Sequence, residues 1–197
     1  MSWILRVSLV ILELLPVAEA EVGYFAAALE TGCLILLLSK STDKLFQPEM
    51  SVLVQQRNIE QGIRLRNKRY IFVGSGCVVF MLAMLLFGRE ILGLYGPEFR
   101  AGYVALCFVS AGACAWTMFS LAPVYLRFVG CSVFVIAMTV VAAVMMAVLT
   151  SVLGLQYGAT GAGIAFCVVL CTVAGVFLCV ATKDFFSREA SDTDQRA

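Results

Sequence analysis

The sequence predicts an all-α protein, a polytopic transmembrane bundle of about six helices. Of its 197 residues, 61% are hydrophobic and 14% are charged, and the mean hydropathy is +0.95. Soluble domains are about half apolar and about a quarter charged, so these proportions indicate a membrane protein. Apolar runs that approach the length of a membrane span recur along the chain, and no strand-like alternation competes with them.

The first predicted span is the apolar run 3–17, which is short compared with the roughly 20 residues that cross a bilayer. It resembles a signal peptide, because one Arg and an apolar stretch precede small residues. Arg6 and Glu13 interrupt the apolar stretch, however, and the rest of the chain also consists of spans. A retained first helix is therefore favoured over a cleaved signal.

The second predicted span, 22–54, is one long and partly amphipathic helix. It continues past its apolar part through Lys40, Lys44 and Pro48, and its last turns are expected to leave the bilayer. The basic segment QQRNIEQGIRLRNKR (55–69) follows as a cytoplasmic linker. Further spans are predicted at 70–88, 101–121, 131–153 and 161–181, and a polar cytoplasmic tail is predicted at 182–197.

The stretch LYGPEFRAG (94–102) is predicted to be a turn at the membrane surface. Pro97 ends the preceding helix, and Gly96 permits the turn. Glu98 falls in the first turn of the next helix, where a negative charge is favoured. Phe99 suits the level of the lipid headgroups. The charges of this stretch are therefore explained by re-entry into the membrane.

The distribution of Lys and Arg predicts the orientation of the chain. With alternating spans, the side that holds the basic 55–69 segment also holds Arg127 and the basic residues of the 182–197 tail. The opposite side has Arg89 and Arg100. Both termini are therefore expected to be cytoplasmic.

Several classes of function are disfavoured by the composition. The sequence has no His, no Ser-centred nucleophile elbow and no glycine-rich nucleotide loop, so no enzyme activity is expected. A net charge of +1 does not indicate nucleic acid, and the positive-inside rule explains the basic 55–69 segment. The eight Cys lie in or beside apolar runs without a CxxC pair. They are expected to be small apolar fillers, and no metal or cofactor is predicted.

Charged residues inside the predicted spans are the candidate functional residues, because charge within the bilayer is costly. Glu30, Lys40 and Lys44 project within about an 80° sector if the second span is one helix. A carboxylate near mid-membrane and two ammonium groups nearer the cytoplasm would suit a phosphate-bearing ligand that enters from the cytosol. These three residues are predicted to bind substrate, and Glu13 and Arg6 are candidates for intramembrane coupling.

Structural interpretations of the same charges stay open. Lys40 and Lys44 can snorkel to the cytoplasmic headgroups. Glu30 can pair with Arg6 or form a hydrogen bond with a neighbouring hydroxyl such as that of Thr31. Small residues also cluster along the chain, and their spacing predicts close contact between helices. The clusters are GSG (74–76), AGACA (111–115) and GATGAG (158–163).

Short motifs occur in an order and at intervals that are typical of one transporter family. They are VGYFAAAL (22–29), QPEMSVL (47–53), LYGPEFRAGYVAL (94–106) and YGATGAGIAF (157–166). Together they resemble the C-terminal half of a polysaccharide flippase of the O-antigen or capsule type. These flippases belong to the multidrug/oligosaccharidyl-lipid/polysaccharide exporter superfamily. The resemblance extends over nearly the whole chain, from about residue 8 to 181.

The resemblance implies a flippase that moves a lipid-linked (undecaprenyl diphosphate) oligosaccharide repeat unit across the bacterial inner membrane. Family members have two lobes of about six helices around a central cavity, so this chain would be one lobe. Its partners would be membrane lipid, the lipid-linked oligosaccharide, and either a second lobe or a second copy of the chain. Many members have a basic residue near the position of Glu30, which is a carboxylate here.

Two other functions stay open beside this one. A cation-coupled exporter lobe of the multidrug type would use Glu13 and Glu30 as its coupling carboxylates. A non-transporting membrane scaffold would instead hold partners of polysaccharide assembly against its small-residue faces.

Overall fold

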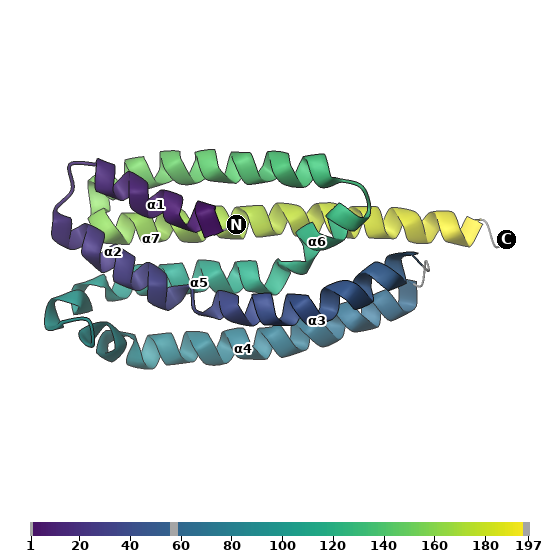
Figure 1. The fold of residues 1–197 in the computed structure, drawn as a ribbon, viewed down its shortest axis with the longest axis horizontal. Coiled ribbons are helices and arrows are strands. Elements are labelled where there is room, and N and C mark those ends of the chain that lie inside the picture. The colour runs from purple at the N-terminus through teal and green to yellow at the C-terminus, as the bar shows by residue number, and fades with distance from the viewer. Residues whose placement is uncertain (1, 56–58, 195–197) are drawn as a thin grey trace.

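The computed structural model describes residues 2–55 and 59–194, with side chains described for 7–44, 46, 48, 52, 61 and 64–183. These residues form an elongated bundle of helices (Figure 1). Every described element is helical, so the predicted all-α fold is confirmed. The elements are α1 (Ser2–Leu14), α2 (Glu19–Gly32), α3 (Ile35–Gln55), α4 (Ile59–Gly93), the 3-10 helix η1 (Pro97–Gly102), α5 (Tyr103–Phe119), α6 (Leu121–Phe128) and α7 (Ser132–Asp194).

Within the described residues, four segments are long and apolar enough to cross a membrane. They are Glu19–Lys44, Arg64–Gly93, Pro97–Phe128 and Ser132–Lys183. The first helix, α1, is not among them. Its 13 residues rise about 20 Å, whereas the hydrocarbon core of a bilayer is about 30 Å thick. The span predicted at 3–17 is therefore a shorter helix, which ends before Pro16 because the residue preceding a proline disfavours helical geometry.

The single helix predicted at 22–54 is wrong, because the chain forms α2 and α3 there, with a two-residue turn between them. The turn lies where α2 packs tightly on α5. A Cβ atom added to Gly32 would lie 2.8 Å from Cγ1 of Val109. The prediction that Glu30 and Lys40 project from the same side of one helix required an unbroken helix. It does not hold, because Glu30 lies on α2 and Lys40 on α3.

The basic segment 55–69, predicted as a linker, is helical from Ile59 onward and forms the first turns of α4. Its Gln, Arg, Leu and Lys residues are good helix formers, and α4 packs along α3. The tail predicted at 182–197 is likewise helical as far as Asp194, as the continuation of α7. A polar composition does not end a helix that is already nucleated, so both polar segments continue the helices beside them.

The turn predicted at 94–102 is confirmed. Gly96 has a φ of 147°, a conformation that favours glycine, and η1 begins with Pro97. The ring of Phe99 packs edge-on against Tyr24 of α2, with ring centroids 5.6 Å apart. This contact fixes the turn to the end of α2.

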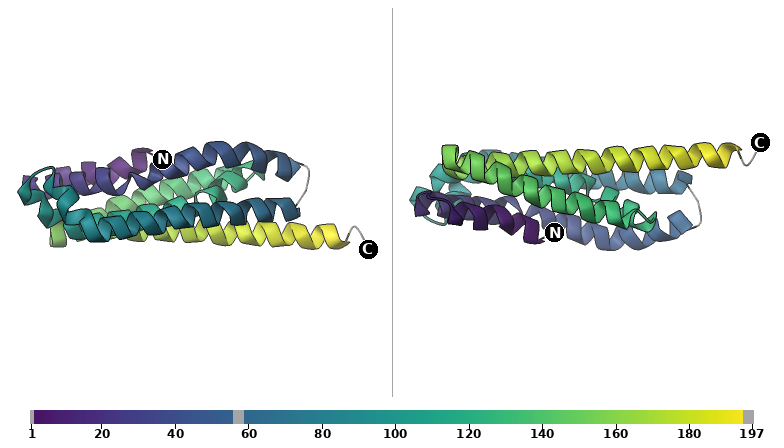
Figure 2. Two further views of the ribbon diagram at one scale, coloured as in Figure 1. Left: turned by 90° about the horizontal axis from the view of Figure 1, so that it is seen from below. Right: turned by 90° about the horizontal axis from the view of Figure 1, so that it is seen from above.

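The long helix α7 is a hairpin. Gly158, with φ 55° and ψ −134°, interrupts it, and its two segments run antiparallel and side by side (Figures 1 and 2). The Glu21 carboxylate accepts a 2.8 Å hydrogen bond from the N–H of Ala159. This is the start of the second segment, where free N–H groups favour an anion. The hairpin thus contains the spans predicted at 131–153 and 161–181.

The inner helix of the bundle is α5, which packs against α2, α3, α4 and α7. Small residues bring the backbones close together. A Cβ atom on Gly112 would lie 2.9 Å from Cα of Cys167, and one on Gly163 would lie 3.1 Å from Cα of Ala105. The close packing predicted from the AGACA and GATGAG clusters is therefore confirmed.

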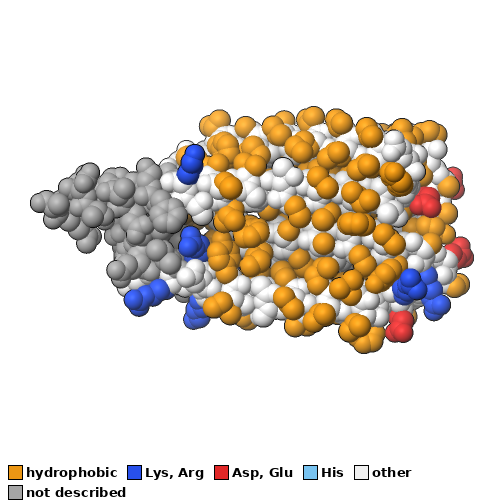
Figure 3. Space-filling model, turned by 180° about the vertical axis from the view of Figure 1, so that it is seen from behind, with side chains coloured by type: hydrophobic (Ala, Val, Ile, Leu, Met, Phe, Trp, Pro, Cys, Tyr) orange, Lys and Arg blue, Asp and Glu red, His pale blue; other side chains and the backbone are white. Residues whose placement is uncertain are grey.

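Apolar side chains on α4 and α7 point outward over the middle of the molecule (Figure 3). The exposed ones on these two helices include Ile71, Phe72, Val78, Val79, Leu82, Leu86, Val133, Ile136, Val140, Val144, Val148 and Val152. Charged side chains gather at the two ends. The basic start of α4, Arg127 and Lys183 lie at one end, and Arg89 and Arg100 lie at the other, as predicted from the alternation of spans.

The eight cysteines are all free thiols. Cys77 and Cys114 are buried between α4 and α5. Each thiol points toward the other residue's backbone carbonyl oxygen, at 3.7 and 3.9 Å. Cys171 and Cys179 are exposed on α7. In the part of the chain that the structure describes, no group of three or more His, Cys, Asp or Glu could hold a metal ion.

Candidate functional site

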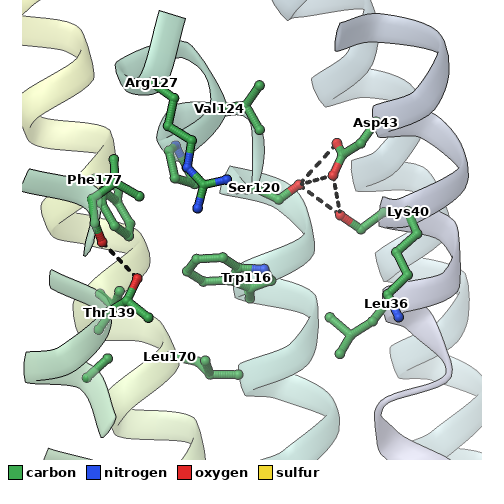
Figure 4. Close-up of a pocket in the computed structure, with 15 residues that line it drawn as sticks. Leu36, Lys40, Asp43, Trp116, Ser120, Val124, Arg127, Thr139, Leu170 and Phe177 are labelled. Carbon is green, nitrogen blue, oxygen red and sulfur yellow. Dashed lines mark hydrogen bonds between the residues drawn. The ribbon is translucent and has the colours of Figure 1, made fainter. Parts of the chain in front are cut away.

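A cavity of about 320 Å³ lies between the helices in the half of the bundle nearer the basic end (Figure 4). We call it the Trp116 cleft. Its described lining comes from α3, α5, α6 and both segments of α7. The lining residues are Leu36, Ser39, Lys40, Asp43, Trp116, Ser120, Pro123, Val124, Arg127, Val135, Thr139, Ala142, Leu170, Val173 and Phe177.

Two cationic side chains face this cleft from different helices. Lys40 comes from α3 and Arg127 from α6, and both are exposed. The guanidinium of Arg127 lies above the Trp116 ring, and the Lys40 side chain runs along α3 toward Leu36 (Figure 4). The carboxylate among the described lining residues, that of Asp43, forms an ion pair with Arg69. No ion pair joins Lys40 or Arg127 to a described carboxylate. The cleft therefore carries two uncompensated positive charges.

One wall of the cleft is a polar network that joins three helices. The guanidinium of Arg69, on α4, is fully buried and donates from Nη2 to Asp43 Oδ1 at 2.8 Å and to Ser120 Oγ at 2.6 Å. Ser39 Oγ lies 2.8 Å from Ser120 Oγ and donates to Asp43 Oδ2 at 3.3 Å. Arg69 thus neutralises Asp43 from the side away from the cleft and links α4 to α3 and to the α5–α6 junction.

The α5–α6 junction places Ser120 in this network. The span predicted at 101–121 corresponds to α5, which ends one residue before Ser120, and the short helix α6 begins one residue after it. Pro123 lies in the first turn of α6, and its ring and missing N–H interrupt the helical hydrogen bonds of the preceding turn. Arg69 donates to backbone carbonyl oxygens at the break, from Nη1 to Met118 at 3.3 Å and from Nη2 to Thr117 at 3.5 Å.

Apart from Thr139, the rest of the lining is apolar and aromatic. Trp116 and Phe177 meet edge to face with centroids 6.2 Å apart, and Leu170, Val173 and Ala142 extend this surface. The cleft therefore combines cations with an apolar floor. Such a site suits an amphiphilic anion, with its charged group at Lys40 and Arg127 and its apolar part against the aromatic rings.

The structure brings one of the predicted substrate residues into the cleft. All three residues are exposed, and Lys40 lines the cleft, whereas Glu30 and Lys44 are not among its described lining. The Thr31 hydroxyl is buried without a hydrogen-bond partner, so the predicted bond between Glu30 and Thr31 is wrong. This hydroxyl lies on the buried face of α2, and Glu30 lies on the exposed face.

Of the two predicted coupling candidates, Glu13 and Arg6, the structure describes the side chain of Glu13. Glu13 is exposed on α1, outside the described lining of the cleft. Arg6 lies outside the residues whose side chains are described.

Sequence reasoning missed Asp43, Arg69, Ser120 and Arg127. Arg69 is the last residue of the basic segment, so it was indistinguishable by type from its solvent-facing neighbours. The available signal was a carboxylate on one helix and a guanidinium on the next, both near the same end of neighbouring antiparallel helices. Pro123 was the signal for the helix break that places Ser120.

Comparisons with known proteins identify no relative of this chain. Searches against protein-family models, curated proteins and solved structures found no match for this chain.

Proposed function

We propose that this chain is one lobe of a membrane transporter that moves a lipid-linked oligosaccharide, with the Trp116 cleft receiving the phosphate end of the lipid. The observation that carries the proposal is the pair of uncompensated cations, Lys40 and Arg127, above an apolar floor. A prenyl-diphosphate-linked sugar has features that complement both parts of the cleft, because its diphosphate is a strong anion and its prenyl chain is apolar.

The chemistry of the two cations supports a phosphate ligand. Arg127 presents a planar guanidinium that can bind two phosphate oxygens at once, and Lys40 adds a mobile point charge. A cavity of about 320 Å³ has the size of a small-ligand pocket. It suits a headgroup, so the sugar and the prenyl chain would extend beyond it.

The arrangement of the bundle supports a role as one lobe. Among the described residues, six helical segments run along the bundle. They are α1, α2 continued by α3, α4, α5 continued by α6, and the first and second segments of α7. Alternating access requires one such unit to move against another, so the transporter would contain a second lobe or a second copy of this chain. By the positive-inside rule, the end with the basic start of α4 would face the cytoplasm of the bacterial inner membrane.

The test is binding of geranylgeranyl diphosphate to the purified full chain, measured by the fluorescence of Trp116 in a Trp3→Phe background, because the chain has two Trp residues. We expect the double variant Lys40→Gln/Arg127→Gln to bind about tenfold or more weakly, since a charge-assisted contact contributes roughly 1.5–3 kcal/mol. The matched control, Lys44→Gln/Arg64→Gln, removes two exposed charges outside the described lining and is expected to bind normally. Equal affinity in both double variants would exclude the cleft as the phosphate site.

Transport itself is tested by complementation of a flippase-deficient strain with this chain, alone and together with a candidate second lobe. Rescue that depends on Lys40 and Arg127 would support the proposal. If the chain binds the lipid but leaves flipping in the deficient strain unaltered, the scaffold function would be favoured instead. The ion-coupled exporter gains no support, because Glu13 and Glu30 are not among the described lining of the cleft.

A further inference from the structure

A second cleft, of about 600 Å³, lies at the end of the bundle opposite the basic start of α4. It is formed where α4 ends and where η1 and α5 begin. We call it the Arg89 cleft. Its described lining residues are Arg89, Glu90, Arg100, Ala101, Tyr103 and Val104.

Arg89 is held in a defined position at this cleft. Its guanidinium carbon lies 5.1 Å from the centroid of the Tyr103 ring, over the ring face. The Tyr103 hydroxyl donates a 3.0 Å hydrogen bond to the carbonyl oxygen of Leu85, which fixes the ring on α4. A cation–π contact leaves the guanidinium charged, and no ion pair joins Arg89 to a carboxylate among the described residues.

Arg100 reaches the same cleft from η1. Its side chain lies against Gly93 in the last turn of α4, where an added Cβ atom would be 3.1 Å from Arg100 Nε. The missing side chain of Gly93 is what lets the guanidinium lie there. Glu90 also lines the cleft, yet no ion pair joins Arg89 or Arg100 to any carboxylate among the described residues. Two unpaired guanidinium groups therefore share one cleft.

The surface beside the cleft is apolar. Leu86 and Phe87, one turn before Arg89 on α4, are 72% and 53% exposed, and Val104 on α5 is 46% exposed. These side chains belong to the candidate spans Arg64–Gly93 and Pro97–Phe128, from which the lining of the cleft also comes. A ligand with a phosphate at the arginines would thus have an apolar surface beside it for hydrocarbon chains.

We propose that the Arg89 cleft binds the phosphate of an anionic membrane lipid, whose acyl chains lie along the exposed apolar side chains of α4 and α5. Paired guanidinium groups recognise phosphate by several parallel hydrogen bonds. Phospholipid headgroups lie at both surfaces of a bilayer, which is where the ends of a spanning helix lie. This site is separate from the Trp116 cleft and does not depend on its function.

The experiment titrates phosphatidylglycerol onto the purified full chain in detergent and counts bound lipid by native mass spectrometry. We expect Arg89→Gln/Arg100→Gln to bind phosphatidylglycerol about tenfold more weakly than the unchanged chain. The matched control, Arg64→Gln/Lys68→Gln, removes the same charge from exposed residues at the other end and is expected to retain binding. Lys40→Gln/Arg127→Gln is also expected to retain it, which separates this site from the proposed function.

Two further titrations identify the ligand, with circular dichroism as the check that each variant is folded. Phosphatidylcholine is expected to bind weakly and equally to all variants, because its headgroup has no net charge. Inorganic phosphate is expected not to displace phosphatidylglycerol at equal concentration, because it lacks the acyl chains. Equal losses of phosphatidylglycerol binding in the Arg89/Arg100 and Arg64/Lys68 variants would contradict the proposal that the lipid binds at the Arg89 cleft. Full displacement by inorganic phosphate would overturn its assignment to a lipid.

Discussion

Arg69 is the largest fully buried side chain in the described structure, and its partner Asp43 is 17% exposed. Two charges leave water when such a pair is buried, and their attraction offsets this cost only when their hydrogen bonds are satisfied. The two terminal nitrogens of Arg69 meet that condition through Asp43, Ser120 and two backbone carbonyl oxygens, whereas its Nε is buried without a hydrogen-bond partner. The pair therefore acts as a crosslink between α3, α4 and the α5–α6 junction.

Breaking this pair from one side is expected to be costly. Arg69→Met leaves Asp43 without its cation, so the variant should lose about 3–5 kcal/mol of unfolding free energy. Replacing both partners, as Arg69→Met/Asp43→Leu, should recover much of that loss, because no isolated charge remains. Thermal or denaturant unfolding in detergent micelles measures both. A double variant as unstable as the sum of the single variants would show that the two residues are not coupled.

At the scale of elements, the α7 hairpin determines how the C-terminal part of the bundle is arranged. It depends on one backbone position, Gly158, whose positive φ is strained for other residues. Glu21 of α2 lies against the same position and caps the second segment at Ala159. A hairpin inside a continuous apolar sequence thus requires a glycine and a capping carboxylate from a distant helix.

Gly158→Ala is expected to destabilise the hairpin by about 1–3 kcal/mol, the usual cost of a strained backbone position. An added Cβ atom would also lie 2.9 Å from the Glu21 carboxyl carbon, so the Ala159 cap would be displaced. Gly175→Ala is the matched control, since it lies in α7 with nothing within 4 Å of an added Cβ atom. It should be neutral or slightly stabilising, because Ala is the better helix former. Equal melting temperatures for both variants would mean that Gly158 does not control the hairpin.

At the scale of the whole molecule, charge and apolar surface are separated along the long axis. The exposed apolar side chains of α4 and α7 cover the middle, and the charged side chains lie at the ends (Figure 3). Such a surface is stable in a bilayer, where the middle meets hydrocarbon and the ends meet headgroups and water. The excess of Lys and Arg at one end is the basis of the proposed orientation.

The proposed orientation predicts which end a membrane-impermeant maleimide reaches in intact cells with a permeabilised outer membrane. In a background with the eight native cysteines changed to alanine, Arg100→Cys should be labelled from outside. Arg64→Cys should be labelled only after the inner membrane is opened. The reverse pattern would contradict the positive-inside assignment.

Local features were the ones that the sequence predicted well. The turn at Gly96 and Pro97 follows from the backbone preferences of two residues. The close packing at Gly112 and Gly163 follows from their lack of side chains. The break between α2 and α3 was missed, although Gly32, the last residue of α2, is of a type that commonly ends helices. The close approach of Gly32 to Val109 of α5 depends on tertiary packing and could not be predicted from the sequence.

The candidate site was predicted only in part, and the reason is again physical. Lys40 was identified because a charge inside an apolar run is costly wherever the run folds. Arg69 and Asp43 could not be paired from sequence, because their contact depends on how α3 and α4 are aligned. From the sequence, Arg127 was assigned only to the basic side of the membrane. Its position beside Trp116 depends on α6, which begins after the break at Ser120.

The sequence by itself determined the all-α class, the run of membrane-length helices and the gathering of basic residues at one end. These follow from composition and hydropathy, which do not depend on how the helices are packed. Only the tertiary structure decided which charges are neutralised and which stay free, and so where an anion can bind. That outcome depends on contacts between side chains that are distant in sequence, such as Arg69 with Asp43 and Ser120.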